Sequence, residues 1–196
     1  MEHRIRQYEL EQGALEIQFI EELFGEFDRR KTATEIMARL NGRANTILMA
    51  EVPMPEDPSQ FVPVSYKVGH ELLADEADPK LRDLVQRLKG AVRFDGRKIF
   101  YSWIGGTRRD WRGQGHFRAL TEQQEVWAAS NGFHEIVVKT KNRFYEMRGA
   151  LARLGFDLVK YERHAPDNRE SKVYLSKQIG SGVLEPRGLQ SKTLNV

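Results

Sequence analysis

The sequence predicts a mixed α/β domain built around a single sheet, and three observations lead to that fold class. Segments with helical periodicity precede the first strand-like run and recur between later ones. Strand-length runs rich in β-branched and aromatic residues make up much of the remaining pattern. A chain of 196 residues can bury one compact core but is short for two full domains. We therefore expect one domain over residues 1–179.

Two helices are expected before the first strand. Ala14–Phe27 has an apolar residue at every fourth position and further apolar residues beside them, which makes a wide apolar stripe. The segment Thr32-Ala33-Thr34-Glu35 has the pattern of a capping box and predicts the start of a second helix. Asn41-Gly42 is expected to end that helix.

The rest of the chain alternates between strands and helices that are bounded by Gly and Pro. The expected strands are Thr46–Val52, Phe61–Glu71, Lys98–Thr107, His134–Thr140, Asp157–Arg163 and Lys172–Gln178. The expected helices run from Asp78-Pro79 to Gly90, from His116 to Asn131 and from Phe144 to Leu154. The first of these helices resembles an insertion between two strands that could otherwise pair directly, and the last two strands can form a hairpin. Residues 180–196 show little periodicity and are expected to form a flexible tail or an interaction arm.

Composition excludes several classes of protein. Hydrophobic residues make up 40% of the chain and charged residues 30%, which is ordinary for a globular domain. No apolar run approaches the roughly 20 residues of a membrane span, and the first residues lack the apolar centre of a secretory signal. The absence of cysteine excludes disulfides and a cysteine nucleophile, and no spacing of His, Asp and Glu indicates a metal site. The net charge of +3 is too small to predict nucleic-acid binding. We expect a cytoplasmic protein that binds neither membranes nor nucleic acid.

The most informative segment is a basic, Gly-containing turn that joins a strand to a helix, Arg112-Gly113-Gln114-Gly115-His116-Phe117. The first N–H groups of a helix lack intrahelical partners and carry partial positive charge, so an anion such as a pyrophosphate can bind there. Gly113 and Gly115 permit positive φ and a close approach of the phosphate, and Arg112 can add a charge-assisted hydrogen bond. The alternative is that the glycines form only a turn. The segment matches neither the dinucleotide fingerprint nor a P-loop.

This turn resembles the R/Q-x-x-G-x-G/A signature of the GNAT superfamily of N-acetyltransferases. Val64–Gly69 resembles the "vGy" strand of that family, Asn131-Gly132-Phe133 leads into a further apolar strand, and Leu154-Gly155-Phe156 resembles its "lGF" segment. The resemblance covers roughly Thr46 to Ile179. It implies a mixed, mostly antiparallel central sheet flanked by helices, with coenzyme A (CoA) bound between two splayed parallel strands. It also implies acetyl-CoA as a co-substrate, without a metal.

The resemblance also implies which residues hold the cofactor. Main-chain groups of Ile104, Gly105, Gly106 and Thr107 would bind the pantetheine arm, and the turn residues Arg112, Gly113, Gln114, Gly115, His116 and Phe117 would hold the pyrophosphate. The His116 ring faces the phosphates or simply covers the first turn of the helix. Phe117 replaces a small residue of the signature, so its ring must turn into the core. Asn142 either donates to the pantetheine arm or caps the helix that starts at Phe144.

The catalytic residues depart from the family pattern. Many relatives have a tyrosine four residues before "GF" as the general acid, but this chain has Leu151 there, which leaves Tyr145 as a substitute acid or a packing residue. The expected strand Lys98–Thr107 carries no glutamate. His70 and Glu71 are therefore the candidates for the general base, with solvated residues at a strand end as the alternative.

The resemblance thus predicts an N-acyltransferase that moves an acetyl group from acetyl-CoA directly to a primary amine. The acceptor would be a small molecule or a peptide, and a homodimer is one possible assembly. The alternative function is a catalytically weak or inactive acyl-CoA sensor or regulatory module, because the position of the usual acid holds Leu151.

Overall fold

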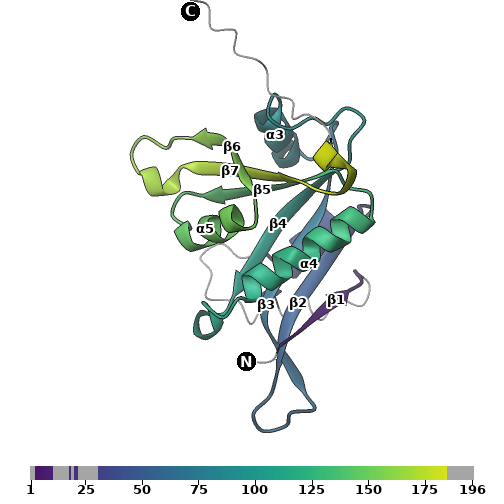
Figure 1. Ribbon diagram of the computed structural model, residues 1–196, viewed down its shortest axis with the longest axis vertical. Helices are drawn as coiled ribbons and strands as arrows, with labels where there is room; N and C mark the ends of the chain where they lie inside the picture. The colour runs from purple at the N-terminus through teal and green to yellow at the C-terminus, as the bar shows by residue number, and fades with distance from the viewer. Residues whose placement is uncertain (1–2, 11–17, 19, 22–30, 185–196) are drawn as a thin grey trace, which may run out of the picture. The chain divides into compact units, whose positions relative to one another are not determined.

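The computed structural model describes residues 3–10, 18, 20–21 and 31–184 (Figure 1). Its seven strands form one mixed sheet in the order β1-β2-β3-β4-β5-β7-β6. The strands are β1 (Arg4–Tyr8), β2 (Asn45–Pro53), β3 (Phe61–Leu72), β4 (Ile99–Thr107), β5 (Glu135–Lys141), β6 (Asp157–Glu162) and β7 (Lys172–Gln178). The described helices are α2 (Ala33–Leu40), α3 (Pro79–Leu88), α4 (His116–Ser130) and α5 (Tyr145–Arg153). Short 3-10 turns lie at η1 (Arg109–Trp111), η2 (Asn168–Glu170) and η3 (Gly180–Leu184).

The predicted fold class is confirmed, and each strand and helix expected from Thr46 onward is present with its ends within one or two residues. The helix α3 does interrupt two strands, β3 and β4, that are neighbours in the sheet. The helix predicted over Ala14–Phe27 lies almost wholly outside the described residues. Strand β1 was not predicted, because its residues are mostly exposed and show only a short alternation. Of the predicted tail, Gly180–Leu184 forms η3 and residues 185–196 lie outside the described part of the chain.

The chain divides into two compact units. The first comprises Met1–His70 and Ser102–Trp127, and the second comprises Glu71–Tyr101 and Ala128–Val196. The turn between β4 and α4 therefore belongs wholly to the first unit. Helix α5 and the strands β5, β6 and β7 belong to the second unit.

In the first unit, β2 is buried on both of its faces. It pairs in antiparallel fashion with β1 on one side and with β3 on the other. On one face Ile47 and Met49 pack with apolar residues of α2 and β3, and on the other face Leu48 and Ala50 pack against Leu120 of α4. This two-sided burial explains why β2 is an almost continuous apolar run rather than an alternating one.

Helix α2 begins with the predicted capping box. The Thr32 hydroxyl accepts a hydrogen bond from the Glu35 backbone N–H at 3.1 Å, and the Glu35 carboxylate accepts one from the Thr32 N–H at 3.0 Å. These two bonds satisfy donors that a helix N-terminus leaves without intrahelical partners. The capping-box prediction is therefore confirmed.

In the second unit, parallel pairing between β4 and β5 covers Ile99–Tyr101 and Glu135–Val137. Strand β7 pairs in antiparallel fashion with β5 and with β6, and the latter pair is the predicted hairpin. Beyond these strands, η3 lies against the start of β5. The Ile179 N–H donates to the His134 carbonyl at 2.9 Å, and a Cβ built on Gly182 would lie only 2.0 Å from that carbonyl oxygen. Only glycine therefore fits at this position.

Candidate functional site

The backbone of the β4–α4 turn requires glycine at two positions. Gly113 has φ 76° and Gly115 has φ 86°, both in the left-handed region that side chains disfavour. Among the described residues, no other atom lies within 4 Å of a Cβ built at either position, so the glycines serve the backbone conformation rather than close packing. Arg112–Gly115 are all exposed. The turn can therefore receive a ligand against its main chain.

Helix α4 presents its N-terminus at this turn. Its ladder starts with the bond from the Ala119 N–H to the Gly115 carbonyl at 3.0 Å. The N–H groups of His116, Phe117 and Arg118 precede that bond and point out of the helix end. These groups and the helix dipole favour an anion. The arrangement can bind a phosphate group through main-chain donors.

Two side chains of the turn fold back on its own backbone. The Arg112 Nε donates to the Thr107 carbonyl at 3.1 Å, and the Gln114 amide donates to the Asp110 carbonyl at 3.3 Å. The first bond holds an exposed guanidinium beside the turn. Arg112 can then bind an anion there with little loss of side-chain entropy.

The end of β4 is fastened to β3. The Ser65 hydroxyl bonds to the Gly106 carbonyl at 3.0 Å and to the Thr107 hydroxyl at 2.7 Å. A Cβ on Gly105 would lie 3.1 Å from the Tyr66 carbonyl oxygen, which is tighter than an ordinary contact. The segment from Ile104 to Thr107 is thus a rigid strand end, and Ser65 is an anchor that the sequence analysis missed.

His116 covers the first turn of α4. It is buried, and among the described residues neither ring nitrogen has a hydrogen-bond partner. The rings of His3 and Trp111 lie against it, with ring centres at 4.7 Å and 6.0 Å. Burial and, secondarily, the charge of His3 lower the pKa of His116. A buried neutral ring supports the covering role over direct contact with phosphate.

Phe117 lies against a lysine. The Lys67 ammonium of β3 lies 4.5 Å from the centre of the half-buried Phe117 ring. Lys67 is itself buried, and desolvation lowers its pKa to about 7, although the charge of Glu125 opposes that shift. The residue at the last position of the signature therefore packs against β3.

The two candidates for the general base differ in their surroundings. His70 is fully buried and its ring centre lies 5.7 Å from that of Trp103 on β4, whereas Glu71 is half-buried. His70 is therefore not a solvated residue at a strand end. Tyr66 belongs to the core cluster of the first unit, and the partly buried Trp103 packs against that cluster. Burial raises the pKa of Tyr66 to about 12.

In the second unit, the side chain of Asn142 bonds to neighbouring residues and does not cap a helix. Its side-chain amide donates to the Asn168 carbonyl at 3.1 Å, and its side-chain oxygen accepts from Arg148. The N-cap of α5 is Phe144, which makes no side-chain capping bond. The capping role of Asn142 is therefore wrong, and its side chain instead joins β5 to η2.

The two residues that bear on proton donation also lie in the second unit. Tyr145 is the first residue of α5 and is 58% exposed, whereas Leu151 of the same helix is fully buried. The Arg148 guanidinium lies 6.0 Å from the centre of the Tyr145 ring. Tyr145 is thus an accessible phenol, and Leu151 is a core residue of the unit.

Ser65 and Lys67 contact the end of β4 and the start of α4, and the sequence analysis predicted neither contact, for the same reason. Both lie on the face of β3 opposite Val64, Tyr66 and Val68, so alternation alone places them in solvent. Helix α4 covers that face, and both residues are buried. The signal was the almost continuous apolar run of β2, which indicates a sheet covered on both faces.

Comparisons with known proteins identify the fold. No family model and no curated protein sequence matches the chain. Among solved structures, Arabidopsis thaliana NAA60 in complex with acetyl-CoA aligns over 91% of this chain and 99% of its own, with a TM-score of 0.65 and 14% identity. The NatC complex bound to Gag peptide and CoA aligns over the same shares, with a TM-score of 0.67 and 14% identity. A GNAT superfamily phosphinothricin acetyltransferase from Sinorhizobium meliloti, in complex with acetyl-CoA, aligns over 100% and 97%, with a TM-score of 0.63 and 12% identity.

The chain has the GNAT fold, as its motifs predicted. The structural neighbours are N-acetyltransferases that use acetyl-CoA, which is the chemistry the sequence resemblance implies. In the part of the chain that the structure describes, no helix has the length and apolar character needed to cross a membrane.

Proposed function

We propose that the protein is an N-acyltransferase that moves the acetyl group of acetyl-CoA directly to a primary amine. One observation carries the proposal. In a chain with the GNAT fold, an exposed turn with glycine at two left-handed positions leads into the N-terminus of a 15-residue helix. That arrangement suits a pyrophosphate and gives the signature residues a common purpose.

The cofactor would be bound mainly by backbone groups. The pyrophosphate would lie on Gly113, Gly115 and the N–H groups that open α4, with Arg112 adding charge. The pantetheine arm would pair with the main chain of Ile104–Thr107, which Ser65 holds in place. Asn142 can donate its second amide hydrogen to the arm, because one hydrogen already bonds to Asn168.

The reaction needs a base, an electrophile and a proton donor. The acceptor amine loses a proton to His70 or Glu71, directly or through water, and its nitrogen forms a bond to the thioester carbonyl carbon. The carbon–sulfur bond then breaks, and the CoA thiolate takes a proton from Tyr145 or from water. Backbone donors polarise the carbonyl, and positioning supplies most of the rate. The acceptor class is a small molecule or a peptide, and NatC offers a peptide-bound example among the structural neighbours.

Binding of CoA is the direct test. A ligand that binds only the folded state stabilises it by about 2.7 kcal/mol at 100 times its dissociation constant, so CoA should raise the melting temperature. Gly115→Asp puts a side chain and a negative charge at the pyrophosphate position and should abolish that rise. Gly90→Asp is a matched control, because Gly90 has φ 87° and equally open surroundings. Equal responses to CoA in the two variants, or none in the parent at millimolar CoA, would contradict the proposal.

The second candidate function is an acyl-CoA sensor that has lost its proton donor. The buried Leu151 at the usual position of the tyrosine favours it. Thiol release from acetyl-CoA in the presence of a panel of small and peptide amines separates the two functions. We expect turnover with at least one amine and a loss of rate in Tyr145→Phe. Tight CoA binding without turnover of any amine would favour the sensor.

A further inference from the structure

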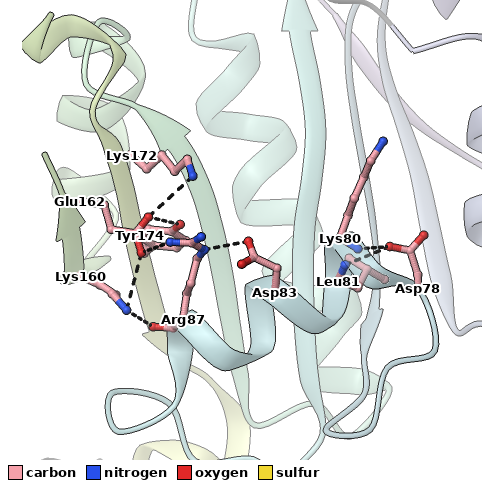
Figure 2. Close-up of polar contacts among 9 residues, drawn as sticks. All are labelled: Asp78, Lys80, Leu81, Asp83, Arg87, Lys160, Glu162, Lys172 and Tyr174. Carbon is pink, nitrogen blue, oxygen red and sulfur yellow. Dashed lines mark hydrogen bonds and ion pairs between the residues drawn. The ribbon is translucent and has the colours of Figure 1, made fainter. Parts of the chain in front are cut away.

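Charged side chains of β7 and β6 form a network with α3 (Figure 2). The strand register adds Lys139 and Lys141 of β5 on the same face. The strand register places them in two rows. Lys139, Tyr174 and Lys160 are cross-strand neighbours in one row, and Lys141, Lys172 and Glu162 form the next. Helix α3 adds Asp83 and Arg87, which lie one turn apart and bond to each other at 2.7 Å.

The carboxylates of this network already have their partners. Glu162 accepts from Arg87 at 2.6 Å and from the Tyr174 hydroxyl at 3.1 Å, and the Lys160 and Lys172 ammonium groups lie 3.6 Å and 3.8 Å from it. The Asp83 carboxylate accepts from Arg87. Lys141 pairs instead with Glu170. In the described part of the chain, Arg87, Lys139, Lys160 and Lys172 then interact with only two carboxylates, Asp83 and Glu162, so positive charge is in excess.

Lys139 differs from the other cations of this network in how it is held. It is half-buried, and among the described residues it makes no hydrogen bond or ion pair. The centre of the Tyr174 ring lies 5.9 Å from its ammonium, and Tyr174 donates its own hydroxyl to Glu162. Burial lowers the pKa of Lys139. The positive charges of Lys172 and Arg87 lower this pKa further, and the negative charges of Asp83 and Glu162 offset only part of the decrease. A partly buried ammonium among other cations is costly unless an acceptor is supplied.

We propose that Lys139, Lys172 and Arg87 form a binding site for an oxyanion, namely a carboxylate or phosphate group of a ligand. Such a group supplies the acceptor that Lys139 lacks and offsets the excess of positive charge. Lys139 and Lys172 are diagonal neighbours on paired strands, a spacing that long side chains can close around one oxyanion. The site lies wholly in the second unit, whereas the β4–α4 turn belongs to the first. The proposed oxyanion binding does not depend on the proposed acyltransferase activity.

The test is stabilisation by inorganic phosphate. Phosphate should raise the melting temperature above that in sodium chloride of equal ionic strength, and Lys139→Gln should remove the difference. Lys80→Gln is the matched control, because Lys80 is an exposed lysine of α3. It bonds to Asp78 through its backbone N–H, which the substitution keeps. Parallel titrations with acetate show whether the site takes a carboxylate or a phosphate. The proposal is overturned if neither phosphate nor acetate stabilises the parent. It is also overturned if phosphate stabilises Lys139→Gln as much as Lys80→Gln.

Binding of phosphate at the β4–α4 turn is a separate event, so all titrations are repeated in Gly115→Asp. The oxyanion site predicts that the phosphate effect survives this change even where CoA binding is lost. Titration of the Lys139 side chain by NMR gives a second readout in the parent protein. Bound phosphate should raise the pKa of Lys139, whereas chloride at equal ionic strength should not. An unchanged lysine pKa at saturating phosphate contradicts the proposal even if Lys139→Gln fails to fold.

Discussion

Lys67 is a buried lysine whose ammonium faces the Phe117 ring rather than solvent. Burial of a charge is costly, and a cation–π contact recovers only part of that cost. The pKa of about 7 means that a modest change in pH alters the charge beneath α4. A single residue therefore links protonation to the stability of the first unit.

The pH dependence of stability should reveal this residue. The pKa of Lys67 is about 7 in the folded state and its ordinary value is 10.5. Between these pH values the unfolded chain binds more protons, so the free energy of unfolding rises with pH, by at most about 1.4 kcal/mol per pH unit from this group. Urea unfolding from pH 6 to pH 10 should show a rise in the parent that Lys67→Met lacks. The exposed Lys80→Met should keep the parent profile, and a persistent rise in Lys67→Met would contradict the assignment.

Ser65 is a second single residue whose substitution should have a measurable effect, in this case on cofactor binding. Its hydroxyl bonds to Gly106 and Thr107, so Ser65→Ala should loosen the strand end proposed to hold pantetheine. We expect CoA to bind about fivefold more weakly, which corresponds to the roughly 1 kcal/mol of an ordinary hydrogen bond. Calorimetric titration of CoA measures the change, with the exposed Ser59→Ala as control. If Ser65→Ala binds as tightly as the parent, the strand end needs no such anchor.

Among the elements, α3 lies in the connection between β3 and β4. It interrupts two adjacent strands and brings Asp83 and Arg87 over the sheet of the second unit. Its amphipathic pattern buries Leu81, Leu84 and Leu88. Asp78 caps the start of the helix, and its carboxylate accepts from the N–H groups of Lys80 and Leu81, both at 2.9 Å (Figure 2).

Removal of that cap should loosen the helix. Asp78→Ala leaves two N–H groups without their acceptor and should lower the free energy of unfolding by about 1 kcal/mol. Because α3 carries Arg87, the variant should also weaken any phosphate effect that depends on Lys139. Chemical denaturation gives the first quantity and melting curves in phosphate give the second. Asp75→Ala, at an exposed residue before the helix, should change neither.

Across the whole molecule, patterns that repeat along the chain were predictable and pairwise contacts were not. Periodicity and Gly stops located the elements from Thr46 onward, and the Arg112–Phe117 motif located the turn, because both depend on local backbone chemistry. The short edge strand β1 carries too few buried residues to reveal itself. A helix cap was one of the two roles predicted for Asn142, beside donation to the pantetheine arm, but its partners are Asn168 and Arg148, and sequence spacing does not encode such contacts.

The contacts of Ile179 and Gly182 make the start of β5 depend on a segment that lies much later in the chain. The His134 carbonyl emerges long before Ile179, its hydrogen-bond partner, and stays hydrated until that residue is made. The same segment also covers the buried ion pair of Arg97 and Glu135, because a Cβ built on Gly182 would lie 2.7 Å from the Arg97 guanidinium. A chain that stops after β5 lacks both β7 and η3, so one edge of β5 stays unpaired, and unpaired strand edges favour aggregation. The start of β5 is therefore covered only after η3 has been synthesised.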